Sequence, residues 1–445
     1  MGVPPASKGW NMHRWTPLTL PLLVGATIAA ATAGAQPMPP PVRALHNPAP
    51  KEGEEFGFPL AVYGDDLLVA VAASDGGVQQ HGRVLQMDLR SGAALRTFDR
   101  PRAAPASGAA RAKGKLEPAN SAVASLLNIE DKVLIGMPYD DAGKQKFTGA
   151  VHIFYSHDGA LLRTLGVPAR HKARAFDARD SRFGAALAHT DGALLVGAPG
   201  VAGLPVAGSR KGPARCGAVF QFELQSGALQ QAYAKDDGRE DDEFGAALAT
   251  ARGMVLVAAP GEAGGGTVYA YNPVGAVPIR SFRRASAMPT GGKASDGFAL
   301  ALATTERFLL VGAPGESTLR PRGGAVYVFD LTTGTLQRVL RPPATKADDL
   351  FGYSVVGLGA HALIGGHGVD RGAGAVFVLD PAGGDTLQTL RAPRPGVEHG
   401  FGMAMAPMGA KVAVSAHREP AGEVGTGVVY VMALDLPGAV TSPAR

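Results

Sequence analysis

The chain is poor in the residues that cross-link a protein or stack against a ligand. Its single cysteine, Cys216, excludes a disulfide within the chain. Both tryptophans, Trp10 and Trp15, lie close to the N-terminus. The rest of the chain therefore has no indole on which a sugar ring or a nucleic-acid base could stack. Because 46% of the residues are hydrophobic, the chain has enough apolar side chains to form a large core without disulfides.

The sequence also lacks any run of five or six like charges, which is a common feature of nucleic-acid-binding segments. Lysine and arginine together number 43 and aspartate and glutamate 38, which gives a formal net charge of +5. This excess is small for 445 residues, so we expect no nucleic-acid partner.

After residue 35 no stretch is apolar over 18 residues, so we expect no transmembrane anchor in the mature chain. Residues 1–35 are typical of a secretory signal peptide, with a weakly basic start, an apolar run over Leu18–Ala31 and the small residues Ala33-Gly34-Ala35 before Gln36. We predict cleavage before Gln36 and a secreted or periplasmic protein. The alternative is an uncleaved membrane anchor, although a proline and a glycine interrupt the apolar run and its length is marginal for a bilayer.

One pattern recurs along the remaining chain: a Phe-Gly pair or a close variant, an alternating apolar stretch, and a triplet similar to Gly-Ala-Pro. The triplet begins 14 residues after the phenylalanine in six copies: Phe56 to Ala70, Phe183 to Gly197, Phe244 to Ala258, Phe298 to Gly312, Phe351 to Gly365, and Phe401 to Ser415. A seventh, degenerate copy runs from Ala122 to Gly136. A constant spacing in seven copies indicates a repeat architecture.

Each copy continues with a variable loop and a Gly-x-Val segment that usually ends in an aromatic residue, as in Gly217-Ala218-Val219-Phe220. Short apolar runs bounded by Gly, Pro and Asp are typical of strands, and each copy of about 58 residues holds about four of them. No helical stretch of ten residues follows the leader. Four strands in each of seven units predict an all-β protein, specifically a seven-bladed β-propeller.

The last copy lacks a good fourth strand, and the missing strand is predicted at the other end of the chain. Leu45 precedes Phe56 by 11 residues, the same spacing that separates Leu340 from Phe351. We therefore predict that residues 41–45 complete the last blade and close the ring. The predicted organisation is a signal peptide (1–35), a closing strand and linker (36–55), the propeller (56–435) and a C-terminal tail (436–445). The alternative is a disordered, proline-rich segment after the leader.

Phe-Gly followed by Gly-Ala-Pro is the signature of the FG-GAP repeat. The chain resembles this family, which includes the seven-bladed propeller of integrin alpha subunits and many bacterial secreted proteins. The resemblance implies that Phe-Gly starts the inner strand and that the triplet opens the loop between the second and third strands. The loops before Phe-Gly and after the triplet would then share one face, which in integrin alpha carries partner and ligand contacts.

The chain departs from integrin alpha where several blades of that family bind Ca²⁺, in a loop between Phe-Gly and the triplet. Ca²⁺ needs six to eight oxygen ligands, so several carboxylates must converge in one loop. The constant spacing of 14 residues leaves only short turns here, with few acidic residues. We therefore predict tight hairpins, no bound metal and no cofactor.

The candidate binding residues lie at or after the triplets. His367 and His417 both occupy the proline position of a triplet in neighbouring repeats, next to the charged residues Asp370, Arg371 and Arg418. Other loops after triplets carry basic residues, namely Arg210, Lys211, Arg215, Arg320 and Arg322. A basic face of this kind would suit an acidic partner, but a solvated rim is the alternative. Acidic pairs before Phe-Gly are expected to be solvated turn and cap residues.

We assign no catalytic residue, because no nucleophile motif, phosphate-binding loop or zinc spacing is present. The function that we expect is a secreted, non-catalytic binding or adhesion scaffold that recognises a protein or glycan through loops on the Gly-Ala-Pro face. Two alternatives stay open: a hydrolase or lyase with His367 and His417 at the channel mouth, and a structural component of the cell envelope. Fold alone does not decide between them.

Overall fold

The computed structural model of the protein describes residues 43–51, 54–73, 82–99, 123–140, 148–172, 174–203, 212–284, 296–421 and 425–436. Within these ranges the regular structure is almost entirely β-strand, and the one helix, α1 (Val369–Gly372), is four residues long. The predicted all-β class is therefore confirmed. No helix in this part of the chain has the length and hydropathy needed to span a membrane.

Five antiparallel sheets contain four strands each, and in every one the strands pair in chain order. The first two are β6 (Ser125–Ile129), β7 (Lys132–Met137), β8 (Ala150–Tyr155) and β9 (Leu161–Leu165), and β12 (Ala186–Thr190), β13 (Ala193–Ala198), β14 (Ala218–Glu223) and β15 (Leu229–Tyr233). The next is β16 (Leu248–Ala251), β17 (Met254–Ala259), β18 (Thr267–Tyr271) and β19 (Pro278–Phe282). The last two are β20 (Ala301–Thr304), β21 (Phe308–Ala313), β22 (Ala325–Asp330) and β23 (Leu336–Leu340), and β24 (Ser354–Leu358), β25 (His361–Gly366), β26 (Ala375–Leu379) and β27 (Thr386–Leu390).

An eight-stranded sheet joins the two ends of the described chain. Its strands are β28 (Phe401–Met408), β29 (Lys411–Ala421), β30 (Gly425–Ala433), β2 (Glu54–Tyr63), β3 (Asp66–Ala73), β4 (Arg83–Asp88), β5 (Ala94–Asp99) and β1 (Arg43–His46). β1 pairs antiparallel with β30, with Leu45 opposite Val429. The strand predicted over residues 41–45 pairs with the last repeat as β1, Arg43–His46, while residues 41 and 42 lie outside the described residues. A two-stranded sheet, β10 (Arg170–His171) and β11 (Arg174–Ala175), completes the set.

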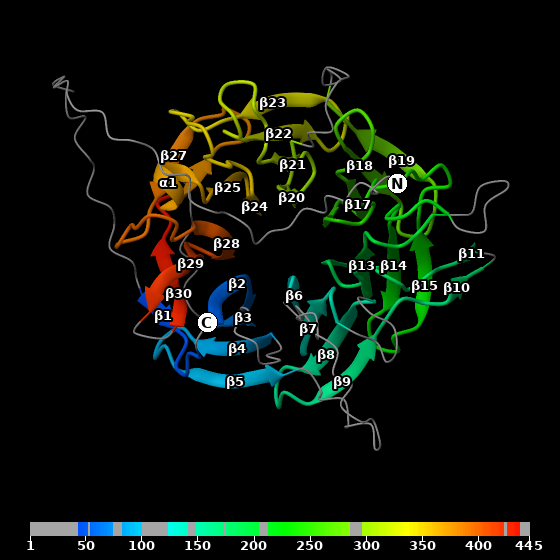
Figure 1. Cartoon of the computed structure of the whole chain (residues 1–445), viewed down its shortest axis with the longest axis horizontal. Coiled ribbons are helices and arrows are strands. Elements are labelled where there is room, and N and C mark those ends of the chain that lie inside the picture. Colours follow the sequence, from blue (N-terminus) through cyan, green and yellow to red (C-terminus); the bar gives the residue numbers. More distant parts are fainter. Residues whose placement is uncertain are drawn as a thin grey trace, which may run out of the picture. The chain divides into compact units, whose positions relative to one another are not determined.

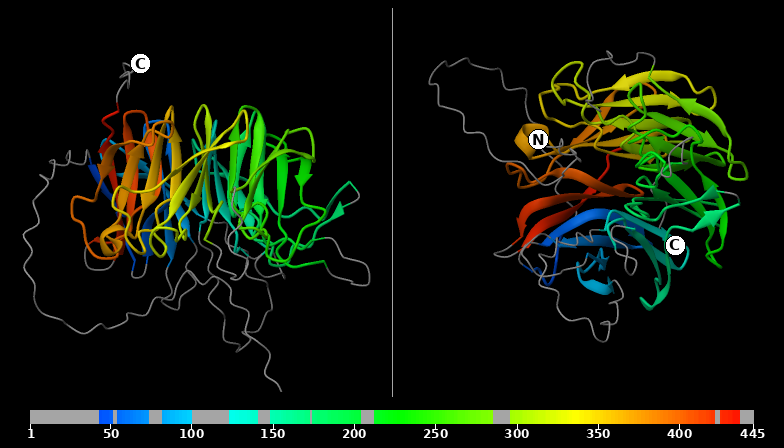
Figure 2. Two further views of the ribbon diagram at one scale, coloured as in Figure 1. Left: turned by 90° about the horizontal axis from the view of Figure 1, so that it is seen from above. Right: turned by 45° about the vertical axis from the view of Figure 1, so that its right-hand side comes forward.

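All of these elements belong to the unit Pro39–Arg445. In the four-stranded sheets the first strand lies toward the middle and the fourth toward the outside (Figure 1). The first strands contact one another: β2 with β6, β6 with β12, β12 with β16, β16 with β20, β20 with β24, β24 with β28, and β28 with β2. Figure 2 shows the sheets standing side by side in this unit. Small antiparallel sheets packed in this way are consistent with a β-propeller.

The hydrophobic cores lie between neighbouring sheets rather than inside any one of them. One cluster combines Leu256 and Val268 of one sheet with Leu309 and Phe329 of the next, and all four are buried. A β-sheet needs a second layer to cover its apolar face, so each repeat depends on its neighbour for burial.

The glycines of the motif are explained by close contact between successive repeats. A Cβ on Gly197, in a triplet, would lie 2.1 Å from the carbonyl oxygen of Gly245, the Phe-Gly glycine of the next repeat. A Cβ on Gly217 would lie 2.0 Å from the carbonyl oxygen of Phe244, and Gly217 also has a φ of +87°. Only glycine allows the backbone of one repeat to come this close to the backbone of the next. The glycines of the motif are therefore required by the packing of successive sheets.

Candidate functional site

Where the structure describes them, loops before Phe-Gly pairs and loops after triplets are joined by backbone hydrogen bonds; we call them the triplet-side loops. The backbone N–H of Asp241, before Phe244, donates to the carbonyl of Ala214 in the preceding repeat at 3.1 Å. The N–H of Gly261, after the next triplet, donates to the carbonyl of Asp242 at 3.2 Å. In the same way, the backbone N–H of Asp348 donates to the carbonyl of Pro321 at 2.9 Å. Loops of two successive repeats are therefore neighbours at these described junctions.

Two of the arginines predicted to form a basic face are neutralised by the acidic residues that precede Phe-Gly. The Arg215 Nε donates to Asp241 Oδ1 at 2.6 Å, and the Arg322 Nε donates to Asp348 Oδ1 at 2.6 Å. The two pairs occupy equivalent positions in their repeats. The basic and acidic patterns found separately in the sequence therefore pair with one another at these two positions, and the binding role of the two arginines stays a prediction.

The other basic candidates have different outcomes. Arg320 is exposed, and its Nη1 donates to the carbonyl of Leu319 at 3.4 Å. Arg371 is also exposed, and its backbone carbonyl accepts a hydrogen bond from Glu398 at 3.2 Å. Arg210 and Lys211 lie outside the described residues.

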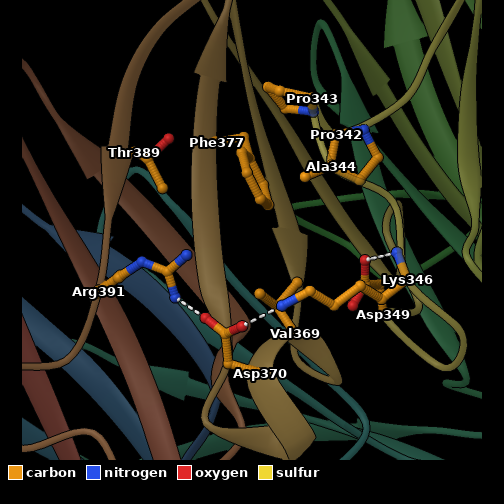
Figure 3. A pocket seen from close by; sticks show the side chains of 10 residues that line it. All are labelled: Pro342, Pro343, Ala344, Lys346, Asp349, Val369, Asp370, Phe377, Thr389 and Arg391. Atoms are coloured by element: carbon orange, nitrogen blue, oxygen red, sulfur yellow. Dashed lines mark hydrogen bonds and ion pairs between the residues drawn. The ribbon is translucent and has the colours of Figure 1, made fainter. Parts of the chain in front are cut away.

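Asp370 lies in α1 with its φ at +51°, in the left-handed region. Its carboxylate accepts hydrogen bonds from Lys346 Nζ at 3.0 Å and from Arg391. These bonds, the one from Lys346 above all, hold the pKa of Asp370 below its usual value. Figure 3 shows the three side chains in a line along one side of a pocket. Asp370 is therefore bound to two cations rather than grouped with the histidines.

The acidic residues were expected to be solvated turn and cap residues; the cap role is confirmed, and Asp241 and Asp348 are exposed, but the acids two positions before Phe-Gly are buried. Glu54, Asp242, Asp296 and Asp349 are each no more than 5% exposed. Each caps its loop: Asp242 Oδ2 accepts the Arg239 N–H at 3.0 Å, and Asp349 Oδ2 accepts the Lys346 N–H at 2.7 Å.

At the junction between β15 and β16 the buried carboxylate is fully paired. Lys235 Nζ lies 2.8 Å from Asp242 Oδ2 and 2.8 Å from Glu262 Oε2, and the Tyr269 hydroxyl donates to Glu262 Oε2 at 2.7 Å. Arg283 Nη2 lies 2.7 Å from the other oxygen of Glu262. Burial alone would lower the pKa of Lys235, but its two hydrogen bonds outweigh burial and raise the pKa. The junction is filled by an ionic network.

This network depends on a correlation between two positions of each repeat that the sequence analysis did not find. The residue four positions after the start of a triplet is an acid where the third strand carries a polar aromatic residue, and a valine where that strand carries phenylalanine. The pairs are Asp140 with His152, Glu262 with Tyr269, Glu316 with Tyr327, Glu419 with Tyr430, Val201 with Phe220, and Val369 with Phe377. Three acidic pairs are hydrogen-bonded, at 2.9 Å for His152, 2.7 Å for Tyr269 and 2.6 Å for Tyr430. An alignment of the seven copies with one another would have shown it.

The two candidate histidines are brought together at the junction between β27 and β28. His417 was predicted at the proline position of a triplet, and β29 continues through His417 and Arg418 and pairs with β30 again at Pro420 and Ala421. His417 is only 4% exposed. The ring of His367 stacks edge-on against Tyr353, with 4.3 Å between the ring centroids. The charge of His367 lowers the pKa of His417, so the two rings lie within electrostatic range.

Burial is the main cause that lowers the pKa of both histidines to about 4, and the positive charge of Arg418 adds to it. Both imidazoles are therefore neutral at neutral pH. Arg418 itself is partly exposed, and its Nε lies 3.9 Å from Glu55 Oε1.

Several buried polar atoms at this junction have no partner in hydrogen-bond geometry among the described residues. They are the Nδ1 atoms of His367, His399 and His417 and the Oε2 atom of Glu419. His399 Nδ1 and Glu419 Oε2 are 4.0 Å apart, while Glu419 Oε1 accepts the Tyr430 hydroxyl at 2.6 Å. Buried polar groups are normally satisfied by protein, ordered water or a ligand. This concentration makes the β27–β28 junction the candidate binding site.

Among the described residues no group of three or more His, Cys, Asp or Glu side chains is arranged to hold a metal ion. The turns between first and second strands are short as predicted; only two residues separate Thr190 of β12 from Ala193 of β13. Cys216 is buried, and its thiol donates to the carbonyls of Pro213 at 3.3 Å and Arg239 at 3.2 Å. Burial raises the pKa of this thiol, which keeps it protonated and unreactive.

In comparisons with known proteins, no family model and no curated protein matches the chain.

Proposed function

We propose that this chain is an FG-GAP-type, seven-bladed propeller that is secreted and acts as a non-catalytic binding scaffold. The blade number is supported by the eight-stranded sheet, which divides into β2–β5 and into β28–β30 with β1. A single parallel pair, Glu55 with Thr426, joins the two halves. With the five separate four-stranded sheets this makes seven units. The contacts between first strands lead from β2 through β6, β12, β16, β20 and β24 to β28 and back to β2, which supports a closed ring.

The observation that carries the proposed function is the gathering of unpartnered polar atoms from His367, His399, His417 and Glu419 on one triplet-side junction. Neutral imidazoles can both donate and accept hydrogen bonds, which suits hydroxyl and amide groups of a glycan or a protein. The partly exposed Arg418 beside them adds a cation that can bind a carboxylate or phosphate. Loops and strand ends on a rigid scaffold are a common location for binding residues.

The pKa values favour binding over catalysis by these histidines. General acid–base catalysis works best when the pKa of the group lies near the operating pH. Both histidines have a pKa lowered to about 4, so at neutral pH they exchange protons poorly with a substrate. This supports the binding scaffold over the hydrolase or lyase alternative.

The test is a glycan and protein array probed with the full-length protein as it is secreted, with and without EDTA. We expect a ligand whose binding survives EDTA and falls at least about tenfold in His367→Ala and in Arg418→Ala. His189→Ala, an exposed histidine on β12, is the matched control and should bind normally. Robust turnover on hydrolase or lyase substrates that is lost in His367→Ala/His417→Ala would overturn the proposal. Protein found only in an envelope fraction would favour the structural alternative.

A further inference from the structure

A second pocket lies at the junction between β23 and β24, apart from the histidines. It has a cavity volume of about 230 Å³. Figure 3 shows Phe377 and the prolines Pro342 and Pro343 on one side, and the line of Arg391, Asp370 and Lys346 on the other. Asp349 and Val369 complete the lining that matters here.

The molecule itself shows what fills this space elsewhere. The loop from Leu340 to Phe351 has the same length as the loop from Tyr233 to Phe244 at the β15–β16 junction. The two loops share their cap, with Asp242 accepting the Arg239 N–H and Asp349 accepting the Lys346 N–H. They also share left-handed backbone conformations at the equivalent residues Asp241 and Asp348. The two junctions can therefore be compared position by position.

At the β23–β24 junction, uncharged residues occupy the positions that form the ionic network at the β15–β16 junction. Pro342 stands where the other junction has Lys235, Val369 where it has Glu262, and Phe377 where it has Tyr269. The buried carboxylate remains, because Asp349 is equivalent to Asp242 and is 3% exposed. Among the described residues Asp349 forms no salt bridge, since the Lys346 ammonium pairs with Asp370 instead.

A third junction shows how the apolar walls alone can be filled. Between β9 and β12 the valine and phenylalanine positions are Val201 and Phe220, as in the pocket. There the ring of Phe176 packs edge-on against Phe220, with 4.8 Å between the centroids. The position of the buried acid is taken by Ser181, which carries no charge. Where no buried carboxylate is present, the space beside the valine and phenylalanine is therefore filled by an apolar ring.

From these two internal precedents we propose that the β23–β24 pocket binds an extended alkylammonium group, a lysine side chain or a free amine of similar length. Its ammonium takes the place of Lys235 Nζ, which lies 2.8 Å from the equivalent carboxylate. Its methylene chain packs on Phe377 as Lys235 does over Tyr269, where the nitrogen lies 5.7 Å from the ring centroid. Both cations of the pocket, Lys346 and Arg391, pair with Asp370, so Asp349 is the pocket carboxylate without a salt bridge among the described residues. Burial raises the pKa of Asp349, as expected for a carboxylate without a cation.

The experiment titrates full-length protein with Nα-acetyl-lysine methylamide, using calorimetry or ligand-observed NMR. The matched probe is Nα-acetyl-norleucine methylamide, which has an aliphatic side chain without the ammonium. We expect the lysine probe to bind at least about tenfold more tightly, and to lose that advantage in Asp349→Asn, because a charged hydrogen bond is lost. Asn keeps the oxygen that caps Lys346. Asp242→Asn, at the occupied junction, is the control and should leave probe binding unchanged.

A second variant keeps the test independent of Asp349. Pro342→Lys supplies a lysine at the position of Lys235, so it should occupy the pocket from within and block the probe. Pentylamine tests whether the ammonium must belong to a lysine residue. If pentylamine and the lysine probe both bind, the pocket accepts any alkylammonium of this length. If only the lysine probe binds, the ligand is a lysine side chain of a protein partner. Equal binding of the norleucine probe, unchanged binding in both variants, or no binding of either amine overturns the proposal.

Discussion

The β15–β16 and β27–β28 junctions share the close contact of a glycine, Gly217 or Gly374, with the carbonyl of the Phe-Gly phenylalanine, but their side-chain chemistry is opposite. At the first, Lys235 lies between two buried carboxylates, and Tyr269 and Arg283 complete the network. At the second, Ala392 stands where the lysine would be, His399 replaces the acid, and Glu419 keeps one oxygen without a partner. The first junction joins two sheets through a satisfied polar network. The second retains polar groups that water or a ligand must satisfy.

The difference teaches that one scaffold separates stability from binding. Glycines fix close backbone contacts at the described junctions of Gly149, Gly217, Gly324, Gly374 and Gly427, and the side chains that fill the space between the loops are free to differ. Removing one member of the ionic network leaves a buried charge without its partner and destabilises the fold, whereas an open junction has no such constraint.

The largest expected effect comes from breaking the filled junction. Lys235→Met leaves Asp242 and Glu262 buried without their cation, so we expect a loss of about 3–5 kcal/mol of unfolding free energy. The control is Lys346→Met, which removes an exposed ion pair with Asp370 and should cost no more than about 1 kcal/mol. Urea unfolding of the two variants measures the difference. Equal losses of unfolding free energy in the two variants would mean that the buried network contributes no more to stability than an exposed ion pair.

The next prediction tests whether the backbone is shared by both junctions. In Gly217→Ala the new Cβ would lie 2.0 Å from the carbonyl oxygen of Phe244, and in Gly374→Ala it would lie 2.1 Å from that of Phe401. We expect each to cost roughly 3 kcal/mol, from the clash and the left-handed backbone. Gly192→Ala, with φ at +73° and open space around it, should cost about 1 kcal/mol in the same thermal or urea unfolding assay. A large difference between the first two would break the comparison.

A smaller effect separates two equivalent carboxylates. Asp242→Asn weakens a charged hydrogen bond to Lys235, so it should destabilise the protein by about 2 kcal/mol. Asp349→Asn removes a buried charge that has no salt bridge and keeps the cap, so its effect should stay within about 1 kcal/mol. Denaturant midpoints at pH 7 decide the matter. Equal destabilisation by both would show that Asp349 is paired in solution.

The smallest effect concerns pH. The pKa values of His367 and His417 fall from 6.5 to about 4 on folding, so the unfolded chain binds protons that the folded chain does not. The stability that this provides is present above about pH 6.5 and is lost as the pH falls toward 4. We expect wild type to lose at least about 1 kcal/mol more over this window than the His367→Gln/His417→Gln variant. Carboxylates with lowered pKa, such as Asp330 at about 2, act mainly below this range. Parallel pH profiles of the two proteins would contradict the assignment.

Much of the fold could be predicted from the sequence because the repeat imposes it. The constant spacing between Phe-Gly and the triplet gives the first two strands and their short turn in each copy. The same arithmetic placed the N-terminal strand on the last repeat, where Leu45 pairs with Val429. The candidate site was predicted only in part: His367 and His417 lie within electrostatic range of each other, but Arg215 and Arg322 pair with acids. The pairing of charges depends on which loops are neighbours in space, and no single stretch of sequence contains that information.

The sequence by itself determined the strand pattern and the places where only glycine fits, because these follow from local periodicity and backbone geometry repeated along the chain. The tertiary structure alone decided which polar groups are satisfied. Asp242 and Asp349 occupy the same position before Phe-Gly, yet one pairs with Lys235 and the other borders an open pocket. The reason is physical: burial makes the energy of a charge depend on its nearest partners, and those partners come from neighbouring repeats.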